Sequence, residues 1–159
     1  MVNKKPFNIV LVAPEIPGNT GSIGRTCVAL GLRLILIHPF GFDLSEKAVR
    51  RAGLDYWKFV DLKEYHSFEE FLEHEAPLRS QLYFFENHQE QHIYQAEFSE
   101  NSYLIFGSET KGLAQEIYQD YKDRMYALPM FSENIRSLNL SNAATTVAYE
   151  CLRQLNLPK

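Results

Sequence analysis

Short, nearly continuous apolar runs alternate with helical patterns along most of this chain. Such runs are typical of parallel β-sheets, because helices cover both faces of those sheets. The alternation therefore predicts an α/β fold with a mostly parallel sheet and flanking helices. Strands are expected at 8–13 (NIVLVA), 33–38 (RLILIH), 81–86 (QLYFFE), 103–107 (YLIFG) and 124–129 (RMYALP), with a weaker candidate at 57–61 (WKFVD). Helices are expected at 20–31, 67–76, 113–121 and 140–155.

The length suggests one domain spanning residues 1–159, since 159 residues can bury a proper core and neither a repeat nor a linker interrupts them. The first apolar run is short and breaks at Pro14. It fits a first strand better than a signal peptide or a membrane span, so we expect a cytoplasmic protein without membrane association. Cys27 and Cys151 lack metal-ligand spacing and are expected to be packed thiols, with no metal site.

The charge balance argues against a nucleic-acid partner at first sight, because the net charge is −4. The charge is nevertheless uneven. Lys47, Arg50 and Arg51 cluster within five residues, and Arg25, Lys111 and Arg136 each lie beside a Gly- or Ser-rich loop. A solvated helix face remains the plain interpretation of the first cluster.

Three polar loops follow strands of the predicted sheet. They cover residues 14–25 (PEIPGNTGSIGR), 107–113 (GSETKGL) and 129–142 (PMFSENIRSLNLSN). Ligands of parallel sheets bind beyond the carboxyl ends of the strands. If these ends share one edge of the sheet, the three loops converge on one site, and this is the main functional indication.

The first loop lacks the G-x-G-x-x-G spacing of a dinucleotide-binding turn. Its glycines allow the backbone to approach a ligand or another loop closely. Asn19 and Thr20 are candidates to cap the helix that follows. Arg25 then falls inside that helix, either as a surface or ion-paired side chain or as a guanidinium directed at a phosphate or a developing oxyanion.

The second loop allows two interpretations. Ser108 and Thr110 could cap the next helix, with Glu109 at its positive end. Alternatively, backbone groups near Gly107 accept a flat cofactor while Glu109 bonds a substrate or holds a loop.

The third loop is the most informative, because it carries more polar side chains than one helix cap requires. Asn139 or Ser141 is expected to begin the last helix. The excess of polar groups indicates a lined pocket. They are Arg136, Ser137, Asn139, Ser141 and Asn142.

Together the three loops resemble the motifs of the SPOUT class of S-adenosylmethionine-dependent RNA methyltransferases. They are most similar to the small, single-domain tRNA ribose 2′-O-methyltransferases that act on the wobble nucleotide, and HPFGF (38–42) and RRAGLDYW (50–57) also fit that subgroup. The resemblance covers residues 8 to about 155. It implies a deep C-terminal trefoil knot that forms the cofactor pocket, a homodimer with Tyr149 near its interface, and tRNA as substrate. It implies no metal.

The resemblance also implies roles for single residues. S-adenosylmethionine would be bound by Phe85, Gly107, Leu128, Ser137 and Leu138. Arg25 matches the catalytic arginine of the family, and other polar motif positions are Asn19, Glu109, Ser141 and Asn142. Ser108 stands where proline is usual and Lys111 where arginine is frequent, so the cofactor loop and a phosphate contact differ in detail.

The chemistry implied is methyl transfer from a sulfonium to a ribose oxygen. An arginine is effectively always protonated, so Arg25 is expected to bind the adjacent phosphate and stabilise the oxyanion, while a phosphate oxygen or water takes the proton. Alternatives are a ribosomal RNA ribose methyltransferase, a non-catalytic knotted RNA-binding module, and a small-molecule enzyme that uses the same loops. The tRNA species, the choice of cytidine or uridine, and any prior modification are left open.

Overall fold

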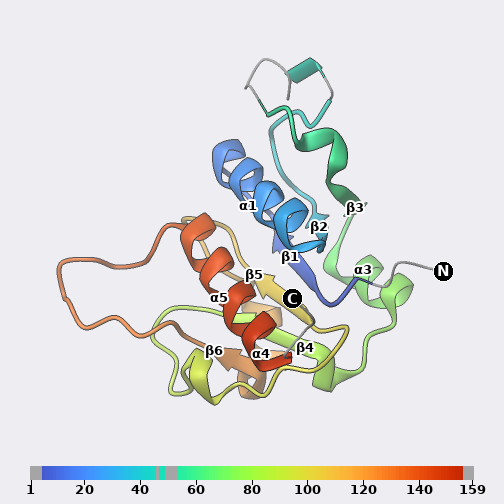
Figure 1. Cartoon of the computed structure of the whole chain (residues 1–159). Helices are drawn as coiled ribbons and strands as arrows, with labels where there is room; N and C mark the ends of the chain where they lie inside the picture. Colours follow the sequence, from blue (N-terminus) through green and yellow to red (C-terminus); the bar gives the residue numbers. More distant parts are fainter. Residues whose placement is uncertain (1–4, 46, 49–53, 156–159) are drawn as a thin grey trace.

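The centre of the protein is a parallel sheet of six strands, seen in a computed structural model that describes residues 5–45, 47–48 and 54–155. The strand order is β3-β2-β1-β5-β4-β6, and every neighbouring pair is parallel (Figure 1). The strands are β1 (Asn8–Val12), β2 (Arg33–Ile37), β3 (Asp61–Tyr65), β4 (Leu82–Phe85), β5 (Tyr103–Phe106) and β6 (Met125–Tyr126). All six carboxyl ends therefore lie at one edge of the sheet.

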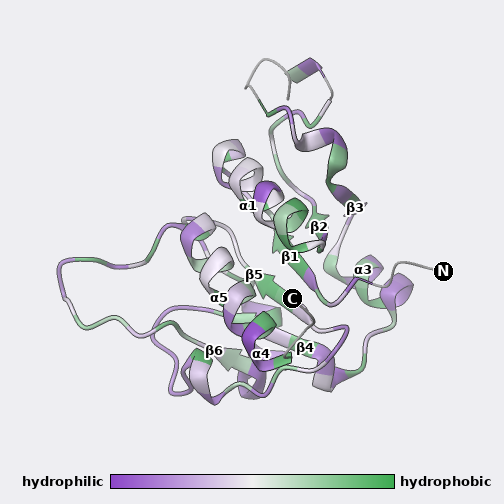
Figure 2. Ribbon diagram, in the orientation of Figure 1, coloured by the Kyte–Doolittle hydropathy of each residue, from purple (hydrophilic) through white to green (hydrophobic). Residues whose placement is uncertain are grey.

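Helices cover both faces of the sheet, which explains why the strands are apolar throughout. Ile9 and Leu11 of β1 belong to a core on one face, and Val10 belongs to a second core on the other. Figure 2 shows the central strands in the hydrophobic colour. The first core includes residues of α1 (Pro17–Leu30) and α5 (Leu140–Leu155), and the second includes residues of α3 (Phe68–Glu75) and α4 (Gln115–Asp120).

The strand predictions at 8–13, 33–38, 81–86 and 103–107 are confirmed, and β6 lies within the predicted range 124–129. The predicted strand at 57–61 is wrong. Residues Trp57–Phe59 form a 3₁₀ helix, and the strand there is β3, four residues further on. β3 is the edge strand of the sheet, and most of its DLKEY sequence is accessible to solvent. A polar edge strand lacks the apolar run by which the others were found.

The start of α1 also differs from the prediction. The helix begins at Pro17, whose fixed φ suits the first helical turn. Asn19 and Thr20 are therefore buried within that turn and do not cap it. The last helix agrees with its prediction, because Oδ1 of Asn139 accepts hydrogen bonds from the backbone N–H groups of Ser141 (2.9 Å) and Asn142 (3.2 Å).

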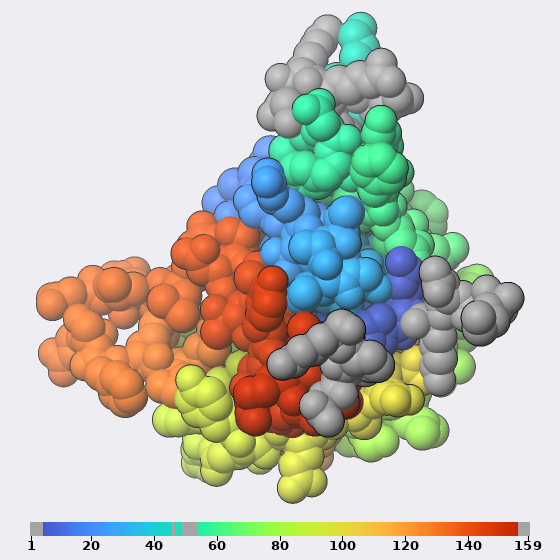
Figure 3. Space-filling view, in the orientation of Figure 1, coloured from blue at the N-terminus to red at the C-terminus, as the bar shows by residue number. Residues whose placement is uncertain are grey.

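A long loop joins β6 to α5 and projects from the body of the molecule (Figures 1 and 3). Phe131, on this loop, is 95% exposed. The chain then returns to α5, which packs against α1 and β5. Both predicted thiols, Cys27 on α1 and Cys151 on α5, are buried and free, as expected.

Two remaining predictions concern the charged segment and membranes. Arg50 and Arg51 lie outside the described residues, while Lys47 is exposed. Over residues 5–45, 47–48 and 54–155, none of the helices combines the length and apolar character needed to span a bilayer.

Candidate functional site

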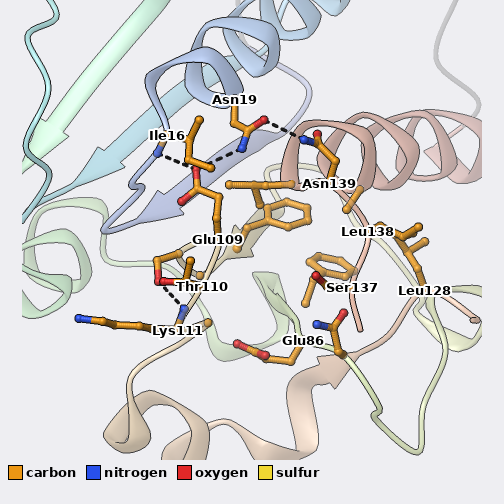
Figure 4. A pocket seen from close by; sticks show the side chains of 18 of the residues that line it. Ile16, Asn19, Glu86, Glu109, Thr110, Lys111, Leu128, Ser137, Leu138 and Asn139 are labelled. Carbon is orange, nitrogen blue, oxygen red and sulfur yellow. Dashed lines mark hydrogen bonds between the residues drawn. The ribbon is translucent and has the colours of Figure 1, made fainter. Parts of the chain in front are cut away.

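The three polar loops meet at the carboxyl edge of the sheet, as predicted, and enclose a pocket of about 550 Å³ (Figure 4). The loop after β1 contributes Ile16 and Asn19, and the loop after β5 contributes residues 107–112. The loop after β6 contributes Leu128, Met130 and residues 137–139. The end of β4 supplies a fourth wall through residues 85–87.

Glu109 joins the loop after β5 to the start of α1. Its carboxylate accepts hydrogen bonds from the backbone N–H groups of Glu15 (2.7 Å) and Ile16 (3.0 Å). Nδ2 of Asn19 also donates to Oε1 of Glu109 at 3.4 Å. α1 has no cap from its own preceding side chain. A carboxylate at a helix N-terminus is stabilised by the helix dipole, so Glu109 serves as the cap that the local sequence lacks.

A chain of amide groups continues from Asn19 to α5. Nδ2 of Asn139 donates to Oδ1 of Asn19 at 3.1 Å, while Oδ1 of Asn139 caps α5. Asn19 is 8% exposed, so its side-chain amide bonds to these protein groups and not to solvent. The network fixes the starts of α1 and α5 relative to Glu109 on one side of the pocket (Figure 4).

The loop after β5 folds back on itself. Ser108 and Gly112 exchange backbone hydrogen bonds of 3.2 and 3.0 Å. A Cβ at Gly107 would lie 2.2 Å from the carbonyl carbon of Gly112, so this tight turn requires glycine there. The suggestion that Ser108 and Thr110 cap the following helix is wrong, since α4 begins only at Gln115 and has no side-chain cap.

The five residues expected to bind a cofactor all line this pocket. The ring of Phe85 stacks on Phe106 with centroids 5.0 Å apart and planes 18° apart. Leu138, which is 43% exposed, also lines the pocket. These five are Phe85, Gly107, Leu128, Ser137 and Leu138.

The residues expected to be catalytic divide into two groups. Asn19 and Glu109 line the pocket, whereas Arg25, Ser141 and Asn142 are not among its lining residues. Arg25 is exposed on α1, with its guanidinium carbon 5.4 Å from the ring centroid of Tyr56. It lies six residues beyond Asn19, which is about 9 Å along a helix axis.

Glu86 is one of several pocket residues that sequence analysis missed. Glu86 directly follows β4 and lines the pocket beside Phe85. Desolvation raises the pKa of its carboxyl group, although hydrogen bonds from the backbone of Leu113 and Asn87 oppose this effect. The signal that could have found it is its position, because a polar residue just after a buried strand of a parallel sheet points to the ligand edge.

A parallel α/β sheet with a pocket built by these three loops agrees with the class of RNA methylases that the sequence resembles. The chain belongs to the SpoU rRNA Methylase family, whose family model matches residues 6–149. The tRNA (cytidine(34)-2′-O)-methyltransferase of Saccharophagus degradans is 43% identical over 150 residues, covering 94% of this chain and 96% of that protein.

Solved structures are similar over the same length. One, described as giving structural insights into the 2-OH methylation of C/U34 on tRNA, is 43% identical with a TM-score of 0.82 and covers 94% of this chain and 96% of its own. The SpoU methyltransferase AviRb of Streptomyces viridochromogenes, solved in complex with AdoMet, is 26% identical with a TM-score of 0.80. That likeness covers 98% of this chain and 63% of AviRb.

Proposed function

We propose that this protein transfers a methyl group from S-adenosylmethionine to the ribose 2′-hydroxyl of the wobble nucleotide of tRNA, with cytidine or uridine as the target. The observation that carries the proposal is the convergence of the loops after β1, β5 and β6 on one pocket. It is joined by 43% identity over nearly the whole chain to a tRNA (cytidine(34)-2′-O)-methyltransferase.

The pocket has the character that S-adenosylmethionine requires. Phe85, Phe106 and Leu138 offer apolar surface for a flat adenine ring, and the backbone at Gly107 and Ser137 offers polar groups. The turn at Gly107 leaves no room for a side chain at that position, so Gly107 itself can offer only backbone groups. When bound, the cofactor supplies a methyl group activated by its positive sulfur.

The reaction forms a carbon–oxygen bond at the ribose O2′ and breaks the sulfur–carbon bond, while the hydroxyl proton passes to a phosphate oxygen or water. Arg25 cannot take this proton, because its guanidinium remains protonated. It binds the adjacent phosphate and stabilises the developing oxyanion. Asn19 and Glu109 hold the loops of the pocket in place. Alignment of the methyl donor with the ribose oxygen lowers the activation barrier by roughly 7–11 kcal/mol.

The proposal includes a homodimer that forms through α1 and α5. Its support is the exposed apolar surface on α5, where Tyr149 is 52% exposed. A symmetric pair would also give Arg25 and the Ser141–Asn142 end of α5 a route to a pocket that they do not line in their own chain. Light scattering of the wild type and of Tyr149→Arg tests this assembly, and a monomeric wild type would contradict it.

The proposal also covers the knot, the number of domains and the cellular location. Residues 1–159 form one domain whose C-terminal part is knotted, and the protein works in the cytoplasm without a metal. The knot is supported by the path of the chain, which leaves β6 at one edge of the sheet and returns to α5 beside β5 and α1.

A ribosomal RNA is the second candidate substrate, because the family takes its description from rRNA methylation. The deciding experiment offers unmodified tRNA and ribosomal RNA separately with labelled S-adenosylmethionine and maps the methylated nucleoside. We expect 2′-O-methylcytidine or 2′-O-methyluridine at the wobble position, absent with Arg25→Ala. Label in ribosomal RNA alone would replace tRNA as the substrate, and cofactor binding without any transfer would favour a binding module.

A further inference from the structure

Glu86 is held firmly at the pocket by its backbone. It follows β4, which lies between β5 and β6 in the sheet. Its N–H donates to the carbonyl oxygen of Tyr126 at 3.2 Å, continuing the parallel pairing of β4 with β6. The side chain is therefore presented from the sheet itself, where the position of a functional group is most precise.

The carboxylate of Glu86 packs on the backbone of the loop after β5. Oε1 accepts a hydrogen bond of 2.5 Å from the N–H of Leu113. A Cβ at Gly112 would lie 2.5 Å from that same oxygen, so glycine at position 112 leaves the space that the carboxylate fills. Figure 4 shows the Glu86 side chain extending along the lower wall of the pocket.

Within the described residues, no cation forms an ion pair with Glu86. Among the described residues that line the pocket, Lys111 is the one with a positive side chain, and it extends away from Glu86 (Figure 4). The other lining acid, Glu109, already accepts the N–H groups of Glu15 and Ile16 at the start of α1. Glu86 is thus a half-buried acid without a counter-charge, which is an unfavourable state for an ionised carboxylate.

We propose that the Glu86 carboxylate is the counter-charge for the positive cofactor and makes the pocket prefer S-adenosylmethionine to its demethylated product. This inference rests on the proposed function. S-adenosylmethionine carries a sulfonium, an ammonium and a carboxylate, so its net charge is positive. S-adenosylhomocysteine has lost the sulfonium charge and is neutral overall. An acid in a pocket of reduced dielectric therefore attracts the donor more than the product, which favours exchange after each transfer.

The test compares the dissociation constants of S-adenosylmethionine and S-adenosylhomocysteine by calorimetry for the wild type and Glu86→Gln. Glutamine keeps the shape of the side chain and an oxygen that can accept the Leu113 hydrogen bond. We expect the affinity for S-adenosylmethionine to fall about tenfold, as for the loss of a charged interaction worth about 1.4 kcal/mol. The affinity for S-adenosylhomocysteine should change less than about twofold by the same reasoning.

Glu116→Gln is the matched control, because Glu116 is an exposed acid on α4 outside the pocket and its loss changes the net charge equally. It should leave both affinities unchanged. Equal losses for the two ligands in Glu86→Gln, or no loss for either, would overturn the role of Glu86 as charge selector while leaving the proposed function standing. A wild-type protein that binds neither ligand would overturn both.

Discussion

Glu15 and Glu109 hold each other's loops by exchanging hydrogen bonds. Oε2 of Glu109 accepts the N–H of Glu15 at 2.7 Å, and Oε1 of Glu15 accepts the N–H of Thr110 at 3.0 Å. The hydroxyl of Thr110 adds a further bond to Glu15 at 2.7 Å. Two segments more than 90 residues apart in sequence are thereby fixed side by side at the rim of the pocket.

Removing the Glu109 carboxylate should destabilise the contact between these two segments. Glu109→Ala leaves the N–H groups of Glu15 and Ile16 without their acceptor and α1 without its cap. We expect a loss of about 1–2 kcal/mol in the free energy of unfolding, which corresponds to a fall of about 2–8 °C in melting temperature. Glu109→Gln retains one acceptor and should lie between the wild type and alanine. An unchanged melting temperature for Glu109→Ala would contradict the capping role, with Glu90→Ala, at an exposed acid outside the helices, as control.

The sheet could be predicted from sequence because its strands are buried on both faces. β1, β2, β4 and β5 read as apolar runs, whereas β3 has a polar DLKEY sequence at the sheet edge and was displaced in the prediction. The convergence of the loops followed from parallel topology alone. Partners across the pocket could not be predicted, since a cap for α1 that comes from Glu109 leaves no local pattern.

Some of the site residues could likewise be predicted from sequence and others could not. The five cofactor residues taken from the resemblance line one pocket, because motif positions fix which loop each belongs to. Arg25, on the exposed side of α1, shows that a motif position does not reveal which way a helical side chain faces. Glu86 has no motif at all, and only the sheet edge and the absent side chain of Gly112 reveal its place.

Gly112→Ala should be markedly more harmful than Gly31→Ala. Both glycines have φ of +67°, so both substitutions carry the left-handed backbone penalty of about 1–2 kcal/mol. Nothing lies within 4 Å of a Cβ at Gly31, whereas at Gly112 it would displace the Glu86 carboxylate. We expect an additional loss of at least about 1 kcal/mol for Gly112→Ala in denaturant unfolding, together with weaker cofactor binding. Equal unfolding energies would show that Glu86 moves aside freely.

Glu86→Gln should increase stability at neutral pH. Burial raises the folded-state pKa of Glu86 above the ordinary value of 4.5, so the folded protein binds this proton more tightly than the unfolded chain does. The free energy of unfolding therefore falls as pH rises from the ordinary value through the raised pKa of Glu86, because the folded protein then has to give up this proton. The melting temperature of Glu86→Gln should exceed that of the wild type at pH 7.5, and the difference should shrink below pH 4.5. A difference independent of pH would contradict this origin.

Cys27 and Cys151 should be unreactive in the folded protein. Both are fully buried, and desolvation raises the pKa of each thiol to about 12. The thiolate is the reactive form, so a disulfide reagent at pH 8 should label neither residue in the native state and both in denaturant. Rapid labelling of the native protein would contradict the packed core between α1 and α5.

Arg25→Lys separates a bidentate guanidinium from a simple positive charge. Lysine keeps the charge but loses the planar fork that matches a phosphate or an oxyanion. We expect methyl transfer to fall about tenfold or more in Arg25→Lys, and about a hundredfold or more in Arg25→Ala. The dissociation constant for S-adenosylmethionine should stay unchanged, because the proposed partner of Arg25 is the RNA and not the cofactor. The melting temperature should also stay unchanged, because Arg25 is exposed. Arg153→Lys, at an arginine 71% exposed near the end of α5, controls for the chemical change itself. Near-full activity of Arg25→Lys would argue against the bidentate role and leave Arg25 as a point charge for RNA.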